Sequence, residues 1–171
     1  MKKSVFLSIG ELFISRDPVQ VWTVLGSCVS VVLYSRKSKI GAICHAQLPS
    51  KDFHGDDCRA NCPNPCYRRA PNSNDFKYVS CSVNYMINKM KDLGASSNDM
   101  YAAVFGGSNV FNIMNDGKSV GQKNAEIAID ILNAHKIKVL RTDLGGKGSR
   151  KIVFNTYTGE VDMKFQQTNL P

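Results

Sequence analysis

Two apolar segments separated by a short polar turn constrain the fold of this chain more than any other feature. The segment from Cys28 to Tyr34 is mainly apolar and contains three valines and one serine, and the segment from Ile40 to Leu48 is similarly apolar. The residues between them, Ser35 to Lys39, are polar or charged. Apolar runs of this length on either side of a short turn are typical of paired strands. We therefore predict a β-hairpin over residues 28–48.

The rest of the pattern adds further short strands and two helices. Apolar residues recur at intervals of three and four from Val83 to Leu93, and Gly94 ends this predicted helix. Ser119 and Gln122 have the spacing of a capping box, which predicts a second helix that reaches about His135. The other predicted strands are Val5–Ile9, Val19–Leu25, Met100–Phe105, Ile137–Thr142, Lys151–Asn155 and Val161–Phe165. About seven strands with two helices predict an α/β (α+β) fold built in layers.

The length of 171 residues favours one domain, since domains average about 150 residues. Hydrophobic residues make up 43% of the chain, which is enough to form a core. We expect a single domain over residues 1–171 that contains one irregular insertion at about residues 50–75. In that insertion, proline, asparagine, cysteine and charged residues replace any apolar periodicity.

The chain carries 22 Lys and Arg against 14 Asp and Glu, a formal net charge of +8. This excess favours an acidic partner. The basic residues are dispersed and do not alternate with aromatic residues, so we expect no nucleic-acid partner. The N-terminal apolar run stops at Gly10, too early for a signal peptide, and we expect no membrane insertion. We therefore expect a cytoplasmic protein whose six cysteines are thiols or metal ligands rather than disulfides.

Cys28 and His45 are the residues of the predicted hairpin that could carry catalysis. Cys28 follows Gly26 and Ser27 at a turn, where backbone N–H groups can lower a thiol pKa and can hold an oxyanion. A hairpin that turns at Arg36–Lys37 would place position 28 opposite position 45. A thiol beside an imidazole is the minimum for an activated cysteine nucleophile. The alternative is a buried structural cysteine and a core histidine bonded to a backbone carbonyl.

A catalytic imidazole needs a third group that fixes its orientation and its tautomer. Thr23, five residues before Cys28 on the preceding strand, is one candidate for this group. Ser27 and Ser30 are others, and the spacing alone does not choose among the three.

A second group of thiols lies within the irregular insertion. Cys58, Cys62 and Cys66 are separated by three residues each, with Cys81 and His54 as further candidate ligands. These spacings are compatible with structural zinc but are not diagnostic of it. We expect no metal, and keep these residues as the candidate ligands of one.

Two glycine-rich stretches, at residues 105–109 and 145–150, invite comparison with phosphate-binding loops. Neither has the spacing of such a loop in the required strand–turn–helix context. We interpret both as tight turns where backbones approach closely.

Five blocks of sequence can be read together, namely Thr23–Leu33, Ile40–Pro49, Phe105–Phe111, Gly121–Asn124, and Asp143–Gly146 with Arg150–Phe154. In this order they resemble the CheD family of chemoreceptor glutamine deamidases. The resemblance extends over nearly the whole chain, apart from the cysteine-rich insertion. It implies a layered α/β sandwich related to bacterial toxin deamidases.

The resemblance also implies a Cys/His/Thr catalytic set, which falls on Cys28, His45 and Thr23. A strict count of the family spacing selects Trp22 in place of Thr23. The implied reaction is deamidation of glutamine side chains on methyl-accepting chemotaxis receptors, without a cofactor, and glutamate methyl esters could be hydrolysed by the same route. A CheC-type phosphatase is the implied second partner. The alternative function is a non-catalytic adaptor that binds receptor or phosphatase helices.

Overall fold

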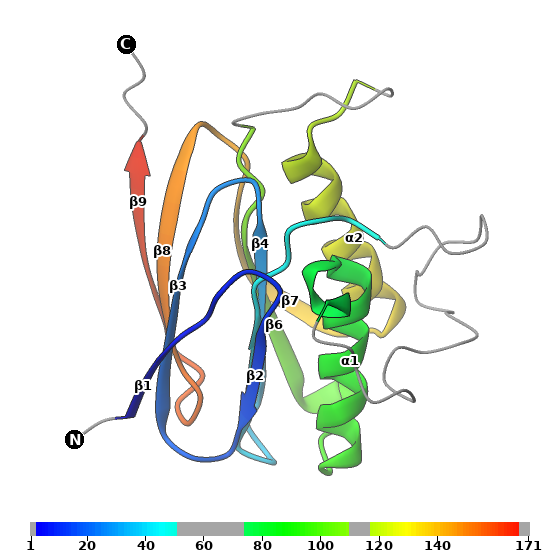
Figure 1. Ribbon diagram of the computed structural model, residues 1–171. Coiled ribbons are helices and arrows are strands. Elements are labelled where there is room, and N and C mark those ends of the chain that lie inside the picture. The colour runs from blue at the N-terminus through cyan, green and yellow to red at the C-terminus, as the bar shows by residue number, and fades with distance from the viewer. Residues whose placement is uncertain (1–2, 51–73, 110–116, 168–171) are drawn as a thin grey trace.

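The computed structural model describes residues 3–50, 74–109 and 117–167. Within these residues the chain forms nine strands, two α-helices and two short 3₁₀ helices (Figure 1). Their bounds are β1 Lys3–Phe6, β2 Leu12–Ser15, β3 Val19–Leu25, β4 Val29–Ser35, β5 Ile40–Cys44, η1 Asp75–Lys77, α1 Val79–Asp92, η2 Ser97–Asp99, β6 Met100–Gly106, α2 Val120–Ala134, β7 Lys138–Leu144, β8 Gly148–Asn155 and β9 Val161–Gln167.

The strands form two sheets that stack face to face. Sheet A has the order β1-β3-β8-β9, and sheet B has the order β2-β5-β4-β6-β7. Both sheets mix parallel and antiparallel pairs, since β1 is parallel to β3 and β6 is parallel to β7. Figure 1 shows α1 and α2 covering the face of sheet B that points away from sheet A. The predicted layered α/β class is confirmed.

Strand β4 lies at the centre of the molecule and is buried on both faces. Its residues Val29, Val31 and Leu33 pack against the helices, whereas Val32 packs toward sheet A, as does Cys28 just before the strand. Because strand side chains alternate between faces, a continuous apolar run is expected for a strand covered on both sides. The same alternation holds in the neighbouring strand β5.

The predicted hairpin is confirmed as the antiparallel pair of β4 and β5, but its register differs from the predicted one. Ser35 pairs with Ile40, and the pattern continues to a bridge between Val29 and Ala46. Extended to position 45, this register places Ser30, not Cys28, opposite His45. The difference arises because the turn spans residues 36–39 and is therefore centred one residue later than predicted. A shift of two residues leaves every side chain on its original face.

Strand β2 was not predicted. It has only four residues, all half-buried, and it pairs with β5 at the edge of sheet B. The first predicted helix begins earlier than expected, at Val79 rather than near Val83. The capping box of α2 is confirmed, because Ser119 Oγ accepts from the Gln122 backbone N–H and Gln122 Oε1 accepts from the Ser119 N–H. In the described parts of the chain, no helix is long and apolar enough to cross a bilayer.

Candidate active site

The bend Gly26–Cys28 carries the chain from sheet A to sheet B, between β3 and β4. All three of its backbone carbonyls accept hydrogen bonds from the segment after β6 and from α2. These bonds run from Ser108 N to Gly26 O at 3.0 Å, from Asn124 Nδ2 to Ser27 O at 3.0 Å, and from Gly107 N to Cys28 O at 2.9 Å. The N–H groups of Ser27 and Cys28 donate to no other residue that the structure describes. Backbone N–H groups without a protein acceptor at a bend are the kind of donor that can stabilise an oxyanion.

Glycine is required where the chain after β6 meets the bend. Gly106 has a φ of 107°, and a Cβ there would overlap the carbonyl oxygen of Cys28. Gly107 and Gly121 also approach each other closely, since a Cβ on Gly107 would lie 2.7 Å from Gly121 O. The interpretation of residues 105–109 as a turn of close backbone approach is confirmed.

Arg150 supports this glycine turn from the other side. Its guanidinium is buried, with only 3% of the residue exposed, and it bonds to Asp143 Oδ1 at 2.6 Å. It also donates to Ser108 Oγ and to Gly145 O, each at 2.9 Å. A buried charge that is paired and hydrogen-bonded fixes the groups around it. Arg150 therefore fixes Ser108, whose N–H binds the bend at Gly26 O.

Cys28 lies at the rim of the space between the sheets and retains 8% exposure, whereas Cys44 is fully buried and faces the helices. Burial raises the pKa of the Cys28 thiol more than the Cys28 backbone N–H lowers it. The prediction that the turn lowers this pKa is therefore wrong in its net direction. Burial raises the pKa of Cys44 to about 12, and this outweighs the lowering effect of backbone hydrogen bonds at Val31 and Cys44. Of these two cysteines, only Cys28 retains any exposed surface.

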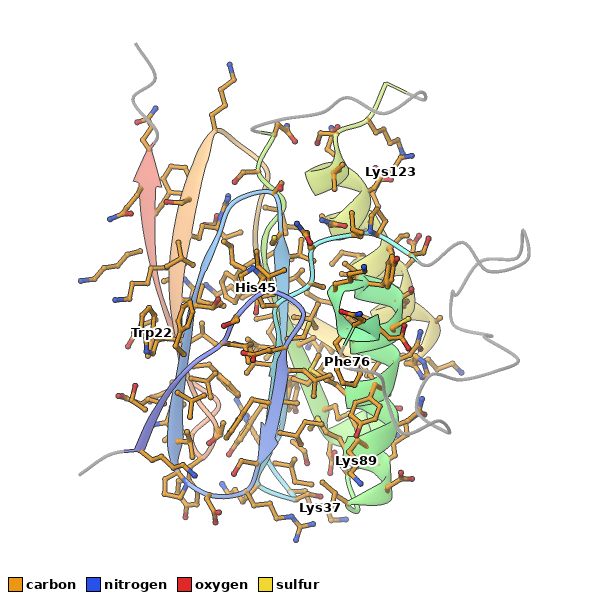
Figure 2. All side chains as sticks on the ribbon, in the orientation of Figure 1. Trp22, Lys37, His45, Phe76, Lys89 and Lys123 are labelled. Atoms are coloured by element: carbon orange, nitrogen blue, oxygen red, sulfur yellow. The ribbon has the colours of Figure 1, made fainter. Side chains whose placement is uncertain are left out.

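His45 lies between the two sheets, as Figure 2 shows, on the same face of sheet B as Cys28. Its Nδ1 is 2.7 Å from Thr23 Oγ1, and Thr23 Oγ1 donates to the carbonyl of Leu7 at 2.7 Å. A hydroxyl has a single proton, so Thr23 must accept from an Nδ1–H of His45. The Leu7 carbonyl, 3.4 Å from Nδ1, also favours a proton there. This tautomer leaves the lone pair on Nε2.

The remaining imidazole nitrogen is free to act as a base. His45 Nε2 is buried and has no hydrogen-bond partner among the described residues. Burial lowers the pKa of His45, and this outweighs the opposite effects of the Leu7 carbonyl and of the Glu11 charge. At neutral pH the imidazole and the Cys28 thiol are thus both neutral. They lie on the same face of sheet B, and the structure shows no hydrogen bond between them.

Of the three candidates for an orienting group, Thr23 is the one that hydrogen-bonds to His45. Thr23 is fully buried and bonded to His45, whereas Ser27 is half-buried at the bend and Ser30 Oγ has no partner among the described residues. Trp22 packs on Phe6 with ring centroids 4.5 Å apart, on the face of sheet A that points away from His45. Thr23 is the residue that the structure brings to the imidazole.

Several residues of the site were not predicted. Asn124, Ser108 and Arg150 all lie in blocks that carry the family resemblance, but nothing in their spacing assigns them a role. The one local signal is an asparagine in the middle of an apolar helical face, because a buried amide usually has hydrogen-bond partners.

The candidate metal ligands Cys58, Cys62, Cys66 and His54 lie outside the described residues. Cys81 is buried in α1. Across residues 3–50, 74–109 and 117–167, no three His, Cys, Asp or Glu side chains are grouped to hold a metal ion.

The fold and the site define a layered α/β protein in which a thiol and an oriented imidazole share the space between two sheets. The family model described as "CheD chemotactic sensory transduction" matches residues 63–165. A Geobacter sulfurreducens protein named "Probable chemoreceptor glutamine deamidase CheD 2" is 34% identical over 94% of this chain and 88% of its own length. A Sulfurimonas denitrificans relative with the corresponding CheD name is 35% identical over 95% of this chain and 94% of its own. The chain belongs to the CheD family.

A third relative, from Thermococcus kodakarensis, is also named a probable chemoreceptor glutamine deamidase CheD. It is 33% identical over 94% of this chain and 91% of its own length. Among solved structures, a Neisseria meningitidis protein superposes with a TM-score of 0.48 at 10% identity, covering 85% of this chain and 64% of that one.

Proposed function

We propose that the protein deamidates specific glutamine side chains on methyl-accepting chemotaxis receptors, as a cysteine-dependent amidohydrolase. Cys28 is the nucleophile, His45 the general acid and base, and Thr23 the residue that orients the imidazole. The observation that carries this proposal is the Thr23–His45 hydrogen bond, which leaves Nε2 free on the face that also holds Cys28. The names of the curated relatives supply the substrate class.

The first step begins from a neutral thiol and a neutral imidazole. His45 Nε2 takes the Cys28 proton as the sulfur attacks the carboxamide carbon of the glutamine, which forms an S–C bond and places negative charge on the oxygen. The N–H groups of Ser27 and Cys28 stabilise this oxyanion. Because the imidazole is neutral before the reaction, it can act as a base without first losing a proton.

The second step releases ammonia and then glutamate. The C–N bond breaks as His45 returns its proton to the leaving nitrogen, and a thioester to Cys28 remains. His45 then deprotonates a water molecule that attacks the thioester carbon, and the thiolate leaves and recovers the proton. A glutamate methyl ester would follow the same route with methanol as the leaving group.

The net charge of +8 favours approach to the acidic, glutamate-rich helices that such receptors present. We further propose that the chain acts as one domain over residues 1–171 in the cytoplasm, without a cofactor, and that a CheC-type phosphatase competes with receptors for the same surface. These points rest on the family resemblance and on the charge.

Mass spectrometry of a receptor fragment tests the proposed reaction. The fragment is incubated with the wild type, with Cys28→Ala and with Cys44→Ala, which removes a thiol from the opposite face of the same sheet. We expect glutamine-to-glutamate conversion with the wild type and with Cys44→Ala, and none with Cys28→Ala. Equal conversion by all three proteins would remove Cys28 from the mechanism. Binding of the fragment without conversion by the wild type would instead support the non-catalytic adaptor.

A further inference from the structure

Asn124 of α2 contacts both halves of the proposed active site. Its side chain is fully buried, and Nδ2 donates to Ser27 O at 3.0 Å and to Gln47 O at 2.9 Å. Ser27 immediately precedes Cys28, and Gln47 lies two residues after His45. The Asn124 amide therefore connects the bend that carries Cys28 to the segment that carries His45.

The two bonds lie where the pairing of these segments opens. The last backbone bridge between them joins Val29 and Ala46. In a regular antiparallel ladder the next mutually bonded pair would be Ser27 and Leu48. Instead the N–H groups of Gln47 and Leu48 both donate to Lys77 O, at 2.7 and 2.9 Å. The strands thus separate beyond the bridge, at the level of Cys28, and the amide of Asn124 spans the gap.

The orientation of this amide is determined by its partners. Both are carbonyl oxygens, which only accept, so the nitrogen of Asn124 must face them. Its Oδ1 is consequently buried, with no hydrogen-bond partner in the described part of the chain. An unsatisfied buried acceptor is unfavourable, so the favourable hydrogen bonding of this amide comes from the two bonds that its nitrogen donates.

The position of Asn124 is also fixed by the packing of the start of α2 against the turn after β6. Gly121, one helical turn before Asn124, lies against the backbone of Gly107. Gly107 and Ser108 are the residues whose N–H groups bind the carbonyls of Cys28 and Gly26. The start of α2 and the turn after β6 therefore pack together, and both bind the Gly26–Cys28 bend.

We propose that Asn124 is a positioning residue that sets the separation between the Cys28 thiol and the His45 imidazole. That this separation matters for catalysis rests on the proposed function. A displacement of about 1 Å between reacting groups can lower a rate about 100-fold. We expect Asn124→Ala to lower kcat by about 10- to 100-fold with little change in KM, because a fully buried side chain does not contact the receptor. Asn124→Asp, which keeps the shape but lacks the N–H donors, should lose as much.

The experiment combines kinetics with alkylation of Cys28 by iodoacetamide as a function of pH, followed by mass spectrometry of the Cys28 peptide. Alkylation needs no receptor, so it tests the positioning even if the receptor proves not to be a substrate. The proteins are the wild type, Asn124→Ala, Asn124→Asp, His45→Ala and the double variant Asn124→Ala/His45→Ala. Ile131→Ala, which opens a cavity in the same helix about 10 Å further along, is the control for lost stability.

We expect both Asn124 variants to react more slowly than the wild type at neutral pH and to lose the part of the pH profile that depends on His45. The double variant should react no more slowly than His45→Ala, because Asn124 acts through the thiol–imidazole pair. Ile131→Ala should keep the wild-type profile. If the Asn124 variants keep that profile and the wild-type kcat while losing thermal stability as Ile131→Ala does, Asn124 is merely structural and the proposal is wrong.

Discussion

Replacement of Thr23 by valine isolates the role of one hydroxyl group. Valine has the shape of threonine but cannot accept the Nδ1 proton of His45 or donate to the carbonyl of Leu7. That carbonyl lies 3.4 Å from Nδ1, beyond the usual hydrogen-bond distance of about 2.7–3.2 Å. In Thr23→Val the imidazole therefore keeps only a weak partner, and the tautomer with its proton on Nε2 becomes accessible. That tautomer cannot take the thiol proton.

The size of the effect follows from the buried donor. Leaving a buried N–H without a good partner costs about 1–3 kcal/mol. In a protein of this size each kcal/mol corresponds to about 2–4 °C, so we expect Tm to fall by about 2–12 °C. If the same free energy separates the productive tautomer from the unproductive one, kcat falls by about 5- to 150-fold.

The assay measures kcat by mass spectrometry of a receptor fragment and Tm by circular dichroism. Thr23→Ser is the matched control, because it keeps the hydroxyl and removes only a methyl group. We expect Thr23→Ser to retain most of the activity at the pH where Thr23→Val has lost it. If the two variants deamidate glutamine at the same rate while both remain folded, the hydroxyl does not orient His45 and the argument from the tautomer is wrong.

Four further predictions test other parts of the account. Because burial lowers the pKa of His45, the unfolded chain binds a proton below about pH 6.5 that the folded chain does not, so Tm should fall from pH 7 to 5. If Tm of His45→Gln falls by the same amount between pH 7 and 5, the fall does not come from His45. His45→Ala should stay folded yet lose at least about 100-fold in kcat, measured on a receptor fragment, and retained activity would exclude it as the base. Gly106→Ala should lower the free energy of unfolding by at least about 1–3 kcal/mol in urea, because alanine is strained at this φ and its Cβ meets Cys28 O; an unchanged value would contradict the close approach. Elemental analysis of protein purified without chelator should find no zinc, and one zinc per chain would assign a metal to the cysteines at 58–66.

The sequence predicts the layered architecture well because its strongest signals are local. The apolar run of β4, the capping box of Ser119 and the periodic helix that ends before Gly94 each depend on neighbours within a few residues. Strand β2 has no such signal, since its four residues are defined by pairing with β5 far along the chain. The hairpin register depends on the centre of the turn at residues 36–39, which a polar sequence does not specify.

The site could be predicted only in part, for a similar reason. The alternation of faces places Cys28 and His45 on one side of sheet B, and a two-residue error in register does not change that. The choice of Thr23 over Ser27 and Ser30 depends on how sheet A stacks on sheet B, which is a tertiary contact. The direction of the thiol pKa likewise depends on burial, because the backbone donors visible as a glycine turn contribute less than desolvation does. The contacts of Asn124 could not be predicted, because they depend on the packing of α2 beside the Gly26–Cys28 bend.

Capture of the acyl-enzyme is the most direct test of the mechanism. The wild type is mixed with a receptor fragment, quenched in acid within the first turnover, digested, and examined by tandem mass spectrometry. We predict that the peptide containing Cys28 carries the receptor peptide less the mass of ammonia, and that hydroxylamine removes this adduct as expected for a thioester. Rapid conversion of glutamine with no adduct on Cys28, or an adduct on another residue, would contradict attack by this thiol.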